Sequence, residues 1–188
     1  MDDLYPWQNE TESYPDELAS GQGYSAVMAT ALTTLPPVSL TWPIQPPPTS
    51  TRGQLFGAVR GAGKPHEGLD MGVAGDTVLA TAPGTVTAAR NTQDARGIMV
   101  LLDIGDGWEV RHYHLSALLA KRGDVVVAQQ PIGVVGASGL PKPWPHLHFE
   151  VRHNGVLVNP QTLLALAAGG GGLVSVALLA GFAWFVLG

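Results

Sequence analysis

The distribution of apolar and polar residues divides the chain into a β-rich middle and two unlike ends. Between Leu40 and Pro160, short runs rich in valine, isoleucine, threonine and aromatic residues alternate with turns that contain glycine, proline, asparagine or aspartate. Such runs are typical of β-strands, because branched and aromatic side chains suit a pleated, half-buried surface. The expected strands are 77–81, 85–89, 98–104, 108–114, 124–128, 132–135, 146–152 and 156–158. Because no helical stretch separates them, the pattern predicts an antiparallel all-β domain, sheet-like or sandwich-like.

Two turns in this region predict hairpins. Gly105-Asp106-Gly107 separates one pair of apolar runs, and His153-Asn154-Gly155 separates another. Glycine and asparagine favour tight hairpins, because the common hairpin turns need residues with positive φ. We therefore expect each pair of flanking strands to be neighbours in the sheet.

The N-terminal end departs from this pattern. Residues 1–35 are acidic and polar, with an alanine-rich stretch at 24–35 that is compatible with a short helix. Residues 36–49 contain six prolines, which predict a stiff, extended linker. We therefore expect an arm at 1–35, a linker at 36–49 and a folded domain over residues 50–161.

The C-terminal end is apolar. Residues 163–188 contain no charged residue, and a helix of that length would span roughly 39 Å, more than the hydrocarbon core of about 30 Å. Trp184 near its end suits an interfacial anchor. The run Gly169–Gly172 would either delay the helix to Leu173 or form a face for close helix packing. The stretch predicts a transmembrane helix; the alternative is a hydrophobic helix buried against a partner protein.

Composition and charge narrow the possible functions. The chain has 188 residues and no cysteine, which excludes disulfides and thiolate metal sites. Its formal net charge is −5, and six of the 15 acidic residues lie in residues 1–51, where there is no lysine or arginine. The rest of the chain is near neutral, so we expect no nucleic-acid partner. Met1-Asp2-Asp3 lacks the basic start of a signal peptide, so we expect no export signal there.

Histidines supply the candidate chemistry, since five of the six fall in three short segments. His146 and His148 lie two apart in an expected strand, so their side chains point the same way, as two metal-binding imidazoles would. Alone, such a pair is more often solvated than functional. His66 and Asp70 lie in a loop that leads into a strand and add one nitrogen and one carboxylate oxygen as possible ligand atoms. His114 lies near the end of another strand.

The sequence does not assign a role to the two remaining histidines. Strand alternation puts His112 on the same face as His114, so it either lines the groove or lies on the surface. His153 stands beside Asn154-Gly155 and is expected to be a turn residue.

Residues 53–160 resemble the M23 family of zinc metallopeptidases, the lysostaphin and LytM type endopeptidases that cut peptidoglycan cross-bridges. The segments that carry the resemblance are His66-Glu67-Gly68-Leu69-Asp70, Ala82-Pro83-Gly84-Thr85-Val86, His114-Leu115-Ser116, Gly123-Asp124-Val125-Val126, Pro131-Ile132-Gly133, Gly136-Ala137-Ser138-Gly139, Pro145-His146-Leu147-His148-Phe149-Glu150 and Asn159-Pro160. The resemblance implies that His66, Asp70 and His148 are zinc ligands and that His114 and His146 are the catalytic histidines. Two imidazoles and one carboxylate leave the fourth tetrahedral position open for water, as a catalytic zinc site requires.

The sequence departs from the family pattern in two places near the site. Family members often carry tyrosine two residues before the catalytic histidine, where this chain has His112, and Tyr113 is shifted by one. The loop before His146 is usually short and rich in glycine and serine, but here residues 140–145 contain three prolines. Trp144 in that loop is placed to shape substrate access.

The predicted function is that of a zinc endopeptidase acting on peptidoglycan peptides. The alternative is a non-enzymatic structural or assembly component that keeps the M23 fold. Because a wall hydrolase without an export signal is unusual, we expect a bacteriophage virion protein rather than a bacterial envelope protein. The C-terminal stretch would then bind a membrane or other virion or membrane proteins.

Overall fold

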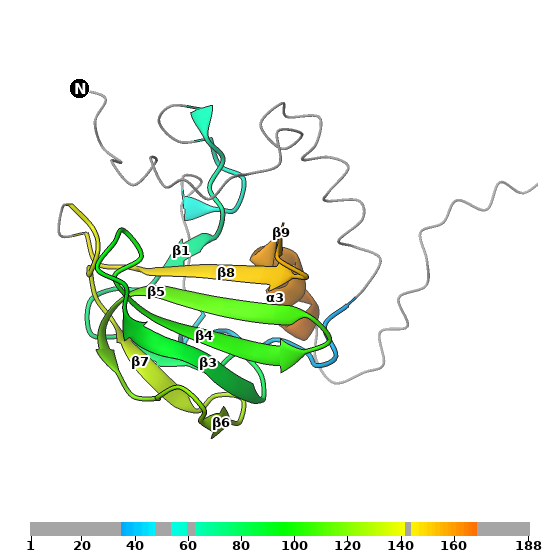
Figure 1. The fold of residues 1–188 in the computed structure, drawn as a ribbon. Coiled ribbons are helices and arrows are strands. Elements are labelled where there is room, and N and C mark those ends of the chain that lie inside the picture. Colours follow the sequence, from blue (N-terminus) through cyan, green and yellow to red (C-terminus); the bar gives the residue numbers. More distant parts are fainter. Residues whose placement is uncertain (1–34, 48–53, 60–62, 142–143, 169–188) are drawn as a thin grey trace, which may run out of the picture.

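The computed structural model describes residues 35–47, 54–59, 63–141 and 144–168. These ranges fold into one nine-stranded antiparallel sheet and one helix (Figure 1). The elements are β1 (Leu69–Met71), β2 (Thr77–Leu79), β3 (Gly84–Asn91), β4 (Ile98–Gly105), β5 (Trp108–Leu118), β6 (Val125–Val126), β7 (Pro131–Val135), β8 (Leu147–His153), β9 (Val156–Val158) and α3 (Pro160–Ala168). The prediction of an antiparallel all-β domain is confirmed.

The main path of the sheet runs β1-β8-β5-β4-β3-β6, with β9 beside β8 and β2 beside β7. Both predicted hairpins are present: β4 pairs with β5 around Gly105–Gly107, and β8 pairs with β9 around Asn154-Gly155. The long strand β5 pairs with β8 through Tyr113 and with β7 from Leu115 onward. This change of partner bends the sheet around a core of apolar side chains.

β5 contains a bulge at the point where its partner changes. On β4, Ile98 pairs with Leu115 and Val100 pairs with His112, so two residues of β5 lie opposite one residue of β4. His114, one of those two, has a φ of 65°. A bulge of this kind interrupts the alternation of side chains between the two faces of a strand. The strand therefore presents Tyr113 and His114, which are consecutive, toward the same side.

The proline-rich segment differs from the expected linker. Its described part, residues 36–47, packs against the domain, with Leu40 and Ile44 buried in the core. The Thr41 N–H donates to the Thr81 carbonyl at 2.7 Å, and the Leu79 N–H donates to the Pro43 carbonyl at 2.8 Å. Proline content suggests a stiff segment, but it does not tell whether that segment is solvated or docked. Burying each of these two side chains is worth about 1.5–3 kcal/mol.

The helix α3 begins earlier than expected. Pro160 occupies the first helical position, and the Asn159 side chain caps the helix by accepting the Gln161 N–H at 2.9 Å. Leu163 and Leu164 pack into the core, close to β8. Within the described ranges, no helix is both long and apolar enough to cross a membrane. The expected transmembrane stretch beyond residue 168 and the expected short helix at 24–35, except its last residue, lie outside those ranges.

Candidate metal centre

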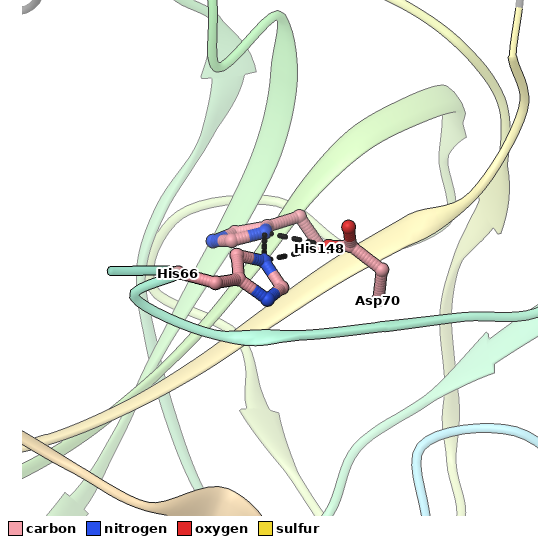
Figure 2. A group of neighbouring side chains, drawn as sticks. All are labelled: His66, Asp70 and His148. Atoms are coloured by element: carbon pink, nitrogen blue, oxygen red, sulfur yellow. Dashed lines mark hydrogen bonds and ion pairs between the residues drawn. The ribbon is translucent and has the colours of Figure 1, made fainter. Parts of the chain in front are cut away.

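His66, Asp70 and His148 meet at one buried point of the domain (Figure 2). The His66 Nε2 atom lies 3.0 Å from His148 Nδ1 and 3.1 Å from Asp70 Oδ1. His148 Nδ1 lies 2.8 Å from the same Asp70 oxygen. The structure thus brings together the three residues that the resemblance to M23 peptidases implied as zinc ligands, each offering one atom to a shared point.

Backbone pairing explains how these side chains converge. β1 pairs with β8 in a register that sets Asp70 opposite His148, so both side chains stand on the same face of the sheet. His66 precedes β1 and is held by residues 55–58: the Gly57 N–H donates to the His66 carbonyl at 2.8 Å, and the His66 N–H donates to the Ala58 carbonyl at 2.9 Å. Two short antiparallel contacts therefore position all three ligand atoms.

Hydrogen bonds on the far sides of the rings select the tautomers. His66 Nδ1 lies 3.1 Å from the Leu55 carbonyl, which can only accept, so this nitrogen carries a proton. His148 Nε2 lies 3.2 Å from a Glu150 carboxylate oxygen and donates in the same way. In a neutral imidazole the other nitrogen is then unprotonated. The nitrogen atoms that face the shared point are therefore the ones able to bind a metal.

The electrostatics of the cluster favour a positive charge at its centre. Burial alone would raise the pKa of the Asp70 carboxyl, but hydrogen bonds and charge from His148 and His66 hold it well below its usual range. Burial alone would lower the pKa of His148, but hydrogen bonds to Asp70 and Glu150 raise it to about 10. Two carboxylates thus stabilise a cation here, whether that cation is a proton on His148 or a metal ion.

The geometry fits a tetrahedral metal ion. Zinc binds imidazole nitrogen and carboxylate oxygen at about 2.0–2.2 Å, which separates neighbouring ligand atoms by about 3.3–3.5 Å in a tetrahedron. The three separations found here, 2.8–3.1 Å, need to widen by about 0.2–0.7 Å. Two nitrogens and one carboxylate oxygen also make up a donor set that zinc accepts in catalytic sites.

His114 and His146 lie beside this cluster. Their ring centroids are 5.0 Å apart, and the His114 centroid lies 5.9 Å from that of His148. His146 Nε2 is 3.6 Å from Asp70 Oδ1. The structure therefore places both expected catalytic histidines within reach of a molecule bound at the cluster.

Backbone carbonyls fix the tautomers of these two histidines as well. His114 Nδ1 lies 3.1 Å from the Ser138 carbonyl, and His146 Nδ1 lies 2.8 Å from the Trp144 carbonyl. Each Nδ1 therefore carries a proton, and each Nε2 is an acceptor when the ring is neutral. Burial, assisted by the nearby His148 and His146, lowers the pKa of His114 to about 3, so this ring is neutral in the physiological range. The unprotonated Nε2 of this ring is a hydrogen-bond acceptor, and a pKa this low makes it a weaker base than a free imidazole.

The bulge in β5 overturns the expected placement of His112. Its side chain is fully buried on the core face, where the ring packs against Phe149 and Nδ1 donates to the Val100 carbonyl at 3.2 Å. It lines no groove and lies on no surface. Tyr113 stands on the site face instead, stacked on His148 with ring centroids 5.8 Å apart. Strand alternation wrongly placed His112 on the same face as His114, because it assumed an unbroken strand.

Several groups that shape the site were missed in the sequence. The carbonyls of Leu55, Ser138 and Trp144 carry no side-chain signal, so no residue pattern could reveal them. Glu150 was detectable: it lies two residues after His148 in a strand, and alternation puts both on one face. His153 stacks on Trp108 away from the cluster, with ring centroids 4.4 Å apart, in keeping with its expected place beside the turn.

Comparison with known proteins extends these observations. The model of a family described as "Peptidase family M23" matches residues 64–160. The murein hydrolase activator NlpD of Escherichia coli is 34% identical over 108 residues, which cover 57% of this chain and 27% of NlpD. The peptidoglycan DD-endopeptidase ShyA of Vibrio cholerae is 36% identical over 96 residues, 50% of this chain and 22% of ShyA. The chain therefore spans about a quarter of the length of these curated relatives.

A solved structure has the same fold over much of the chain. The crystal structure of a zinc containing peptidase from Vibrio cholerae superposes with a TM-score of 0.58 at 28% identity, covering 65% of this chain and 39% of that one.

Proposed function

Because the chain belongs to peptidase family M23, we propose that it is a zinc-dependent endopeptidase that hydrolyses peptide cross-links of peptidoglycan. The observation that carries the proposal is the convergence of three ligand atoms within 3.1 Å of one another, with two further imidazoles beside them. A binding module would need neither the open donor set nor a neutral histidine next to it.

In this proposal His66 Nε2, Asp70 Oδ1 and His148 Nδ1 hold the zinc ion. When bound, zinc supplies a Lewis acid that polarises a peptide carbonyl and makes water more acidic. The protein supplies the proton transfers. A neutral Nε2 atom, of His114 or of His146, accepts the proton of the attacking water, and the leaving amine is protonated by one of the same rings. The Ser138 and Trp144 carbonyls keep both acceptors in the required tautomer.

The proposed substrate class rests on the relatives. Both curated relatives described above have names that refer to murein or peptidoglycan. Peptidoglycan peptides as substrate follow from this and from the resemblance noted in the sequence.

A second candidate function is a non-enzymatic one, in which the domain binds or assembles with other proteins. The name of NlpD, a murein hydrolase activator, favours it. This chain has a histidine or an aspartate at each of the three expected ligand positions and two further histidines beside them, and both features favour hydrolysis. The two functions differ in whether the purified protein acts on its own.

The test is to measure the zinc content of the purified protein and the release of new amino groups from purified cell walls. His148→Ala should abolish both. His153→Ala removes a histidine that stacks on Trp108 away from the cluster and serves as the matched control, which should retain both. Hydrolysis at the wild-type rate in His148→Ala would refute the proposed site. Hydrolysis that appears only after a second wall hydrolase is added would support the activator function.

The location of the protein remains a prediction from the apolar stretch 163–188. We propose that it is anchored by this stretch in a virion membrane or assembly, with the bacterial envelope as the alternative. Detection of the protein in purified phage particles, and not in the envelope of uninfected cells, is the expected result.

A further inference from the structure

We propose that Glu150 is a positioning residue that tunes the metal affinity of His148 through a charge-assisted hydrogen bond. The inference rests on the proposed zinc site and concerns a residue that the family resemblance did not assign. Glu150 follows His148 by two residues on β8, and its side chain is buried, with 4% of the residue exposed.

The two carboxylate oxygens of Glu150 contact different partners. Oε1 lies 3.2 Å from His148 Nε2, on the ring edge opposite the metal-facing Nδ1. Oε2 accepts the Arg152 Nε–H at 3.2 Å and lies 4.0 Å from Arg111 Nη1. The carboxylate is therefore held between one imidazole and two guanidinium groups, and its orientation is fixed from both sides.

This arrangement places cationic groups beside the buried carboxylate. Arg152 Nε lies 3.2 Å and Arg111 Nη1 lies 4.0 Å from Oε2, and positive charges at such distances stabilise the ionised form of a carboxyl group. Each arginine also has a second acidic partner. Arg152 Nη2 lies 3.6 Å from Glu67, and Arg111 Nε lies 2.6 Å from Glu109. Removal of the Glu150 charge would therefore leave neither arginine without an ion pair.

An anionic acceptor on the far nitrogen does two things to a metal-binding imidazole. It holds the proton on Nε2, which keeps Nδ1 available, and it makes Nδ1 a stronger electron donor. Loss of such an outer partner typically weakens metal binding about 10- to 100-fold. Neutral hydrogen bonds are roughly half as strong as charge-assisted ones, so an amide in place of the carboxylate should have an intermediate effect.

The experiment measures the zinc dissociation constant of the purified protein by competition with a chromophoric chelator. We expect Glu150→Ala to raise this constant about 10- to 100-fold and Glu150→Gln to raise it by less. Glu109→Gln is the matched control, because Glu109 contacts Arg111 and none of the cluster contacts described above involves it; its constant should equal that of the wild type. A second readout is the tautomer of His148, followed by long-range proton–nitrogen NMR, in which the Nε2-protonated form should lose population in Glu150→Ala.

The outcomes separate this inference from the proposed function. A wild-type protein that binds no zinc would overturn both. Wild-type zinc binding with an unchanged dissociation constant and tautomer in both Glu150 variants would overturn the positioning role alone. The Gln variant is nearly isosteric, so it tests the positioning role even where Glu150→Ala fails to fold.

Discussion

His112 should make the domain sensitive to acid, although it takes no part in the proposed chemistry. The ring is fully buried in the core, and within the described part of the chain its Nε2 has no hydrogen-bond partner. Burial lowers the pKa of His112 from 6.5 to about 4, opposed by the hydrogen bond to the Val100 carbonyl. Folding therefore favours the neutral ring, and protons bind more readily to the unfolded chain.

The sign and size of the effect follow from linkage. Above pH 6.5 the ring is neutral in both states and has no effect on stability; between pH 6.5 and pH 4 only the unfolded chain takes up the proton, so stability is lost as the pH falls. Between pH 7.5 and pH 4.5, the free energy of unfolding should fall by about 2.5 kcal/mol through this residue alone. His112→Leu replaces the titrating ring with an apolar side chain of similar size. At pH 7.5 the lost hydrogen bond should cost about 1 kcal/mol.

The assay is urea unfolding at pH 7.5 and pH 4.5, with a chelator present so that metal release does not contribute. The quantity compared is the loss of unfolding free energy between the two pH values. We expect this loss to be smaller in His112→Leu than in the wild type by about 2.5 kcal/mol. An equal loss in the two proteins would show that His112 is protonated in the folded state, which would contradict its burial without a second partner.

Three further predictions concern the site. Gly68→Ala should weaken zinc binding at least about 10-fold, because a Cβ there would lie 2.8 Å from the His148 ring; wild-type affinity in a chelator competition would contradict this. His114→Ala and His146→Ala should each retain zinc but slow wall hydrolysis about 10²- to 10⁴-fold, since they remove proton carriers and no metal ligand; measured zinc loss would instead make them ligands. Trp144→Ala should raise KM about 2- to 10-fold with kcat little changed, because the exposed indole is lost while its carbonyl still holds His146; a fall in kcat alone would refute a substrate-contact role.

Much of the fold was predictable because its signals are local. The hairpins follow from the residues of their turns, and the strands follow from runs of branched and aromatic residues. The expected strand 124–128 shrank to the two residues of β6, since Val125 and Val127 are exposed and only a short stretch pairs with β3. The docking of Leu40 and Ile44 could not be read from the sequence, because composition predicts how stiff a segment is and not what it contacts.

The candidate site was predictable to a different degree. The clustering of histidines in three segments suggested a metal site, and the resemblance to M23 peptidases implied His66, Asp70 and His148 as its ligands before the structure brought them together. Whether they bind zinc stays a prediction. The bulge that separates His112 from His114 had no local signature in the sequence. His114 adopts its positive φ at the point where β5 changes its pairing partner from β8 to β7. A non-glycine residue in such a conformation costs about 1–3 kcal/mol, which the surrounding sheet has to offset.

The three carbonyls that orient His66, His114 and His146 have a consequence for how this protein can vary. Leu55, Ser138 and Trp144 serve those rings through main-chain atoms, so the hydrogen bond survives a change of side chain as long as the backbone path is kept. Ser138 is the exception, because its hydroxyl accepts the Ile98 N–H at 2.8 Å and donates to the Leu115 carbonyl at 2.6 Å, so its side chain helps to keep the backbone path. The Trp144 ring also packs on the His146 ring, with centroids 4.9 Å apart, so a library randomised at position 144 would change this ring contact while the carbonyl keeps the His146 tautomer.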